Sequence, residues 1–228
     1  GRVLDALDKI DPGRGAPVVG IEPPEIYCLK HDYLDLLPER EAEIRQRIPG
    51  VWLMDEFLVR SPEFQNLRIG SKGPVFEMDS RNKLWFHPHC HQRAEGLSED
   101  GLPTGTNATL ELLRLCGFDV ELIDSGCCGM AGTFGYEAEH YDLSMKVGEL
   151  RLFPLLKTRS ALGTSPKSDI ERLDVNSTST IEFGGGWEGV LSSGAACRLQ
   201  ISQGTGVEAV HPILAVASRL KELSHAKE

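Results

Sequence analysis

The sequence contains no apolar run close to the roughly 20 residues that a membrane-spanning helix needs. No basic segment followed by an apolar one stands at its start, so no signal peptide is visible. Basic residues are also scarce: 24 Lys and Arg face 34 Asp and Glu, a formal net charge of −10. Binding to nucleic acid needs a concentrated basic face. We therefore expect no nucleic-acid partner and no transmembrane segment, and a cytoplasmic or peripheral membrane location.

The rest of the composition is that of an ordinary globular protein, with 40% hydrophobic and 25% charged residues among 228. Six cysteines stand out. Without a secretion signal, a disulfide framework is not expected, because thiols stay reduced inside the cell. Cysteines in such a chain more often bind metal or carry out redox chemistry, so the function is sought there.

Short apolar segments alternate with helical patterns along the chain, which predicts an α/β fold with a mostly parallel sheet and crossover helices. The stretch 60–81 is expected to be mostly loop, and residues 158–187 a mobile insertion, because of their Gly, Pro, Ser and Thr content. We expect strands over 17–22, 83–87, 118–123 and 189–193, and helices over 3–10, 23–37, 39–48, 51–59, 106–115, 136–156 and 206–223.

Four cysteines follow the ends of predicted strands: Cys90, Cys127, Cys128 and Cys197. Loops at the carboxyl ends of parallel strands gather around a common ligand site. These thiols are therefore expected to meet although they are distant in sequence. Small residues beside them, Gly126 and Gly129 among them, allow close backbone approach and N–H donation to sulfur.

From the chemistry of the residues alone, such a group of thiols has three alternative functions. A Cys₄ zinc site is one, although the paired Cys-x₂-Cys motifs typical of zinc modules are absent. A thiol–disulfide catalyst is another, although no Cys-x-x-Cys motif exists. An iron–sulfur cluster is the third, and glycine-rich surroundings with backbone donors suit it.

Three segments resemble a known family. They are Ser-Gly-Cys-Cys-Gly-Met-Ala-Gly-Thr-Phe-Gly-Tyr at 125–136, His-Pro-His-Cys-His at 87–91 and Cys-Arg-Leu-Gln-Ile at 197–201. They resemble the cysteine-rich (CCG) domain that occurs in heterodisulfide reductases and in the iron–sulfur subunits of glycolate oxidases. The segment 130–136 looks most like the C-terminal region of FAD-linked D-lactate and D-2-hydroxyglutarate dehydrogenases.

The resemblance implies a Rossmann-like CCG domain in which Cys90, Cys127, Cys128 and Cys197 bind a [4Fe–4S]-type cluster, with Gly126 and Gly129 beside it. The sequence also departs from the family pattern at two places. Gln200 stands where a closing cysteine is usual, and Glu22-Pro-Pro-Glu replaces Glu-Pro-Ser-Cys. Cys28 lies a few positions beyond that second motif and is expected to be a fifth ligand.

The same resemblance implies that residues 1–82 are the remnant of a first cysteine-rich repeat with linking helices, and that 83–228 form the second CCG-type domain. The expected function is an electron relay from flavin to a quinone or another carrier. The FAD itself would be bound by a missing part of the parent protein, and the partners would be its FAD-binding and ferredoxin-like regions. No dehydrogenase activity is expected from this chain alone. The alternative is a structural or interaction domain that binds zinc or no metal.

The remaining candidates receive structural interpretations. Cys116 lies on an apolar helix face and is expected to be a small core residue. His87, His89 and His91 surround Cys90, and we expect one of them to pack or hydrogen-bond around the thiols rather than to bind metal directly.

Overall fold

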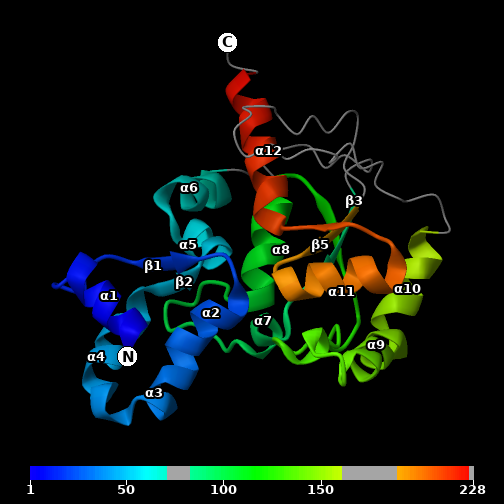
Figure 1. Ribbon diagram of the computed structural model, residues 1–228. Coiled ribbons are helices and arrows are strands. Elements are labelled where there is room, and N and C mark those ends of the chain that lie inside the picture. Colours follow the sequence, from blue (N-terminus) through cyan, green and yellow to red (C-terminus); the bar gives the residue numbers. More distant parts are fainter. Residues whose placement is uncertain (71–82, 161–188, 226–228) are drawn as a thin grey trace.

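The computed structural model describes residues 1–70, 83–160 and 189–225. Within these ranges the chain contains two parallel sheets (Figure 1). The smaller sheet pairs β1 (Val18–Gly20) with β2 (Val51–Leu53). The larger sheet has the strand order β4-β3-β5-β6, formed by β3 (Lys83–His87), β4 (Asp119–Leu122), β5 (Gly189–Ser192) and β6 (Ala209–Val210). The predicted α/β fold with a parallel sheet and crossover helices is therefore confirmed.

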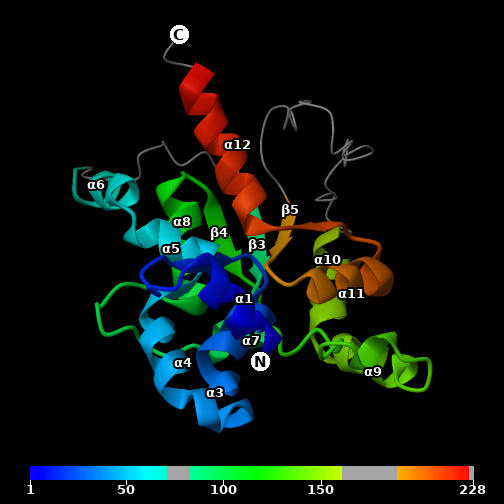
Figure 2. The ribbon, with the colours of Figure 1, turned by 60° about the vertical axis from the view of Figure 1, so that its left-hand side comes forward.

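Helices cover both faces of the larger sheet, and alternation along β3 shows why. Leu84 and Phe86 pack with α5 (Met54–Arg60), α8 (Gly105–Leu115) and α12 (Pro212–His225) on one face. Trp85 packs with α10 (Leu152–Ser160) and α11 (Ala195–Thr205) on the other face. Figure 2 shows α5 and α8 on one side of the sheet and α10 and α11 on the opposite side. Because both faces are covered, β3 and β5 consist almost wholly of buried residues.

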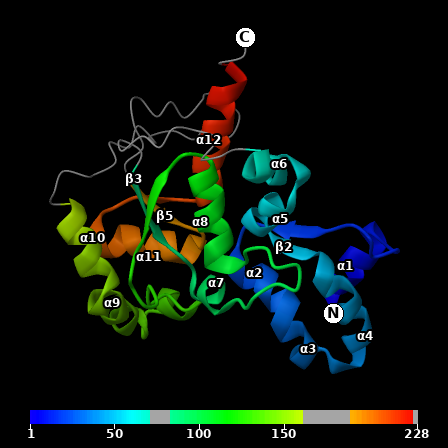
Figure 3. The same cartoon turned by 180° about the vertical axis from the view of Figure 1, so that it is seen from behind.

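The smaller sheet belongs to an N-terminal group of short helices with its own core. These helices are α1 (Arg2–Ile10), α2 (Pro23–Tyr27), α3 (Tyr33–Leu36) and α4 (Glu41–Arg47), with a π-helical turn over Cys28–Asp32. Leu4, Ile26, Ile44 and Val51 form the centre of that core. Seen from behind, this group lies on one side of α8, and α9 (Tyr141–Leu150), α10 and α11 lie on the other (Figure 3).

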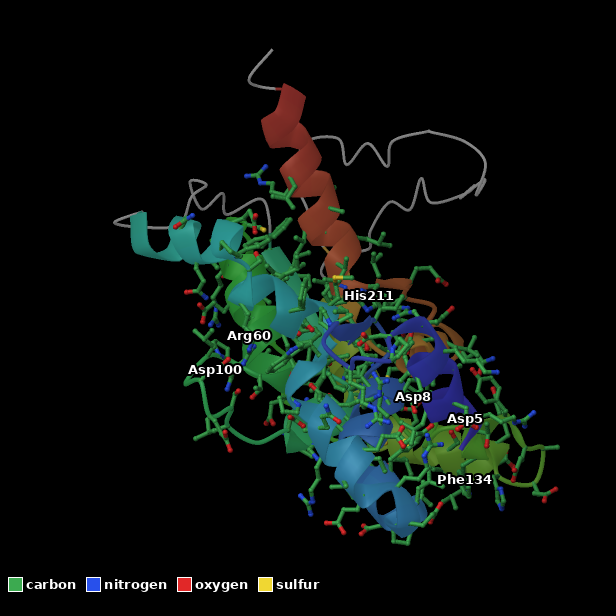
Figure 4. The ribbon with its side chains drawn as sticks, turned by 90° about the vertical axis from the view of Figure 1, so that its left-hand side faces the viewer. Asp5, Asp8, Arg60, Asp100, Phe134 and His211 are labelled. Atoms are coloured by element: carbon green, nitrogen blue, oxygen red, sulfur yellow. The ribbon has the colours of Figure 1, made fainter. Side chains whose placement is uncertain are left out.

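Ion pairs join helix α1 to the arginines of the segments that follow it in the N-terminal group. Asp8 of α1 receives hydrogen bonds from Arg14 at 3.0 Å and from Arg47 at 2.6 Å, and Asp5 receives one from Arg40 at 2.6 Å. Figure 4 labels Asp5 and Asp8 on α1, where it packs beside α4. The bonds from Arg14 and Arg47 hold the pKa of Asp8 well below its usual range.

Several predicted elements have different bounds in the structure. The helix predicted over 51–59 was wrong at its start, because Val51–Leu53 is strand β2 and α5 begins only at Met54. The loop predicted over 60–81 was wrong in its first part, where α6 spans Pro62–Gly70. The single helix predicted over 136–156 begins only at Tyr141, after a 3₁₀ turn over Phe134–Tyr136, and is divided into α9 and α10. The helix predicted from 206 begins only at Pro212, after β6.

Two predictions lie wholly or largely outside the described residues. These are the second half of the 60–81 loop and the insertion over 158–187, of which only the first three residues, the end of α10, are described. None of the helices in the described ranges is long and apolar enough to span a membrane.

Candidate metal centre

The loops after three neighbouring strands meet at the carboxyl edge of the larger sheet. The strand order reverses between β3 and β5, because β4 lies beyond β3 and β6 lies beyond β5. In open α/β sheets, this reversal point is where ligands bind. The loops that begin here carry all four strand-end cysteines, as the sequence predicts.

Cys90 follows β3 and is the first residue of α7 (Cys90–Ala94). Two side-chain hydrogen bonds stabilise the N-terminus of this helix. The His89 side chain accepts a hydrogen bond from the backbone N–H of His91 at 3.2 Å, and Gln92 Oε1 accepts one from the N–H of His89 at 3.2 Å. The thiol of Cys90 is exposed and hydrogen-bonds the Cys127 sulfur, which raises the pKa of Cys90.

Cys127 and Cys128 lie in the loop after β4, on a sharp bend at Gly129. The backbone of Gly129 has φ +102°, a conformation that favours glycine, and its N–H donates to Cys127 Sγ at 3.3 Å. Hydrogen bonding with the neighbouring Cys128 and Cys90 thiols lowers the pKa of Cys127. Cys127 is exposed, whereas Cys128 is buried. Gly126, the other glycine predicted beside the cofactor, has open space around it.

Cys197 lies in the first turn of α11, directly after the loop that follows β5. Its Sγ is 3.4 Å from Cys128 Sγ. The hydrogen bond from Cys128 lowers the pKa of Cys197, and a weaker contribution comes from a hydrogen bond with His87. The same segment holds three buried oxygens that have no hydrogen-bond partner in the described part of the chain, on Ser192, Ser193 and Gln200.

The structure thus brings four of the predicted residues together as one group of thiols: Cys90, Cys127, Cys128 and Cys197. Cys28 is not brought into this group, because the interactions of its thiol are with Asp32 in the same turn. Cys116 is confirmed as a core residue, since it is 1% exposed and packs with α8 neighbours.

Of the three histidines around Cys90, His87 is one that hydrogen-bonds a thiol, as expected for one of them. It ends β3 and is 1% exposed, and one of its ring nitrogens lies within 4.8 Å of both Cys128 Sγ and Cys197 Sγ. The available signal was its place at the carboxyl end of a central strand.

The donor set suits a thiophilic metal or an iron–sulfur cluster. Thiolates are the ligands that bind iron–sulfur clusters, and a group of thiolates with an imidazole is also typical of zinc. Buried sulfurs, backbone N–H donors and unpartnered buried oxygens in one region of the fold fit such a group.

Comparison with known proteins places the chain near two kinds of dehydrogenase. It is 27% identical over 209 residues to D-2-hydroxyglutarate dehydrogenase of Escherichia coli (strain K12), a match that covers 91% of this chain and 16% of that protein. It is 26% identical over 210 residues to one of the subunits of anaerobic glycerol-3-phosphate dehydrogenase from the same organism, a match that covers 91% of this chain and 41% of that relative. The D-2-hydroxyglutarate dehydrogenase of Haemophilus influenzae is 22% identical over 208 residues, with 91% of this chain and 16% of that protein covered.

This chain therefore spans about a sixth to two fifths of the length of these relatives. The expected similarity to D-2-hydroxyglutarate dehydrogenases is confirmed, and the CCG domain stays a prediction. No protein-family model matches the sequence. No solved structure matches it either.

Proposed function

We propose that this chain is the iron–sulfur electron-transfer module of an FAD-linked 2-hydroxyacid oxidoreductase. The observation that carries the proposal is the meeting of Cys90, Cys127, Cys128 and Cys197 at the reversal point of the sheet. The four thiols come from three loops, so their meeting is a property of the fold. The similarity to two kinds of dehydrogenase supports redox chemistry as the use of this site.

When bound, an iron–sulfur cluster supplies one-electron transfer between a donor and an acceptor. The chain's own residues would hold and tune it. Cys128 and Cys197 would bind it from the buried side, and Cys90 and Cys127 from the exposed side. The Gly129 N–H donates to the Cys127 sulfur, and such donors shift the reduction potential of a cluster.

The exposed side is where electrons would enter and leave. Cys90 and Cys127 are solvent-exposed, so a donor or acceptor can approach the centre there. In the proposed parent protein the donor would be FAD, through its FAD-binding and ferredoxin-like regions, and the acceptor a quinone or another carrier. One relative is itself a component of a multi-subunit dehydrogenase, which supports partner chains or regions.

The test is anaerobic purification of the full chain, followed by iron and sulfide analysis and EPR of the reduced protein. We expect iron and sulfide with an EPR signal, lost in Cys128→Ser and retained in the control Cys116→Ser, whose thiol lies in the apolar core. Cys28→Ser tests the fifth ligand predicted from the resemblance. A folded, iron-free and sulfide-free protein from anaerobic cells would overturn the proposal.

A zinc site is the second candidate, and one distance favours it. Two thiolates on a single tetrahedral zinc ion, with Zn–S bonds of about 2.3 Å, lie roughly 3.8 Å apart. The Cys128 and Cys197 sulfurs are 3.4 Å apart, close to that separation. Metal analysis of the same sample separates the candidates, since zinc without sulfide supports a structural site and iron with sulfide supports the relay.

A further inference from the structure

The imidazole of His87 is held in one orientation at the buried end of the thiol group. Its Nδ1 lies 2.9 Å from Ser125 Oγ, and both residues are buried. Histidines that bind metal through one ring nitrogen usually bond a fixed partner through the other, which sets the ring's orientation and tautomer. The His87–Ser125 pair has this arrangement.

The His87 ring also faces two sulfurs and hydrogen-bonds one of them, that of Cys197. Because Nδ1 is engaged by Ser125, Nε2 is the nitrogen available to the thiols. His87, Cys128 and Cys197 each offer one ligand atom, and these atoms lie within 4.8 Å of one another. This buried trio is compact enough for its three atoms to share one metal ion, since metal–nitrogen and metal–sulfur bonds are about 2.0–2.3 Å.

The neighbouring His89 lacks this arrangement, although it is also near the thiols. Its Nδ1 accepts a hydrogen bond from the backbone N–H of His91. The backbone N–H of His91 can only donate, so it places the His89 proton on Nε2, whereas the Ser125 hydroxyl can accept from Nδ1–H of His87 and leave an electron pair on Nε2 of His87. His87 is therefore the better nitrogen ligand of the two.

We infer that His87 Nε2 is a ligand of the metal centre, beside Cys128 and Cys197. The inference rests on the proposed metal centre and adds a nitrogen to its thiolate ligands. A neutral imidazole leaves a cluster with less negative charge than a thiolate does, and replacement of thiolate by histidine raises reduction potentials. The ion that carries His87 would accept an electron more readily than an all-thiolate centre.

The test uses electron–nuclear double resonance on the reduced chain, purified anaerobically from cells fed ¹⁵N-labelled histidine. We expect one strongly coupled ¹⁵N nucleus. His87→Cys keeps a ligand atom at this position, and it should retain the metal, lose the nitrogen coupling and lower the reduction potential. The control His140→Ala removes a more exposed histidine that pairs with Glu137, and it should leave the coupling unchanged.

A cluster signal without a strongly coupled histidine nitrogen would overturn the inference, and so would a coupling that persists in His87→Cys. If the protein holds no iron, the proposed relay fails but His87 can still be tested with Co²⁺ alone. Co²⁺ bound by His87 should give a paramagnetically shifted, exchangeable imidazole N–H proton in the NMR spectrum. Its absence in the Co²⁺-loaded wild type, or its persistence in His87→Cys, would refute the role of His87.

Discussion

Glu22 and Arg198, which are 176 positions apart in sequence, form an ion pair with Oε1 3.3 Å from Nη2. The other carboxylate oxygen of Glu22 accepts a hydrogen bond at 2.9 Å from the backbone N–H of Ala195, in the first turn of α11. Arg198 also donates to the carbonyl oxygens of Ser192 and Ser193, at 3.0 and 2.8 Å. The residue before α2 thus fixes the loop after β5 and the first turn of α11, where Cys197 lies.

A second contact joins the same parts. His211, at the start of α12, has Nε2 3.1 Å from the carbonyl oxygen of Ile21. Figure 4 labels His211 at the base of α12, close to the N-terminal segment. Together these contacts hold the segment after β1 against the residues that follow β5 and β6. The segment after β5 contains Cys197.

Glu22→Gln should destabilise the first turn of α11 and make Cys197 more accessible. A carboxylate at a helix N-terminus with charge-assisted bonds contributes about 1–2 kcal/mol, and glutamine retains only neutral bonds. We expect the free energy of unfolding to fall by about 1 kcal/mol and Cys197 to be alkylated faster in the metal-free protein. Denaturant titration and mass spectrometry measure the two effects. Glu25→Gln, at an exposed position three residues away, is the matched control. Equal behaviour of the two variants would contradict this role of Glu22.

Gly129→Ala should disrupt the centre, whereas Gly126→Ala should be tolerated. A Cβ at Gly129 would clash with the carbonyl oxygen of Ser144, and φ there is +102°. At Gly126 nothing lies within 4 Å of the added atom. Clash and backbone strain together should cost Gly129→Ala at least about 2 kcal/mol of unfolding free energy, with loss of bound metal. Chemical denaturation measures the unfolding free energy, and metal analysis measures the bound metal. A stable, metal-loaded Gly129→Ala would show that the loop accepts a side chain at this position.

Asp55 should make stability depend on pH. It is 6% exposed and hydrogen-bonds Thr109, and Gln92 Nε2 lies 3.4 Å away. Burial raises the pKa of Asp55 to about 6, above its unfolded value of about 3.9. A folded pKa that is raised favours the protonated native state, so this contribution is fully present below about pH 4 and is lost as the pH rises through about 6.

The matched experiment measures unfolding free energy from about pH 4 to about pH 7.5 in the wild type and in Asp55→Asn. On acidification, the wild type should gain about 2–3 kcal/mol relative to the variant. Asp35→Asn, at an exposed position, is the control and should run parallel to the wild type. A constant difference between wild type and Asp55→Asn across this range would show that Asp55 keeps an ordinary pKa.

Cys127 should be the most reactive thiol of the metal-free protein at about pH 5. It is exposed, and hydrogen bonding with Cys128 and Cys90 lowers its pKa, whereas the pKa of Cys90, the other exposed thiol, is raised, so we expect Cys127 to be ionised first of the two. Burial raises the pKa of Cys116 to about 12, which makes this core thiol the internal control. Iodoacetamide labelling with peptide mapping should show Cys127 modified first and Cys116 last. Uniform labelling of the six cysteines would mean that the thiol group does not persist without metal.

Local sequence patterns predicted the central part of the fold well. The strand over 83–87 was predicted with its observed bounds, and the helix over 106–115 and the strand over 118–123 differ from α8 and β4 by one residue at each end or less. Such segments are recognisable because buried apolar runs, capping residues and the glycine that ends a helix act over a few neighbouring residues.

The wrong predictions fall where a short apolar run fits either structure. Val51–Leu53 became a strand because Val18–Gly20 lies beside it in a parallel register, a partner that the run itself does not reveal. The division of the 136–156 segment comes at Arg151, where the backbone leaves the helical region between α9 and α10. Periodicity alone does not distinguish these cases.

For the site, the sequence by itself determined which cysteines follow strands and therefore share one edge of a parallel sheet. Only the tertiary structure decided that Cys28 pairs with Asp32, that His87 faces Cys128 and Cys197, and that Glu22 caps the helix of Cys197. The first result follows from local periodicity and the geometry of parallel strands. The second depends on how helices pack across many residues of intervening chain, and no local pattern encodes those distances.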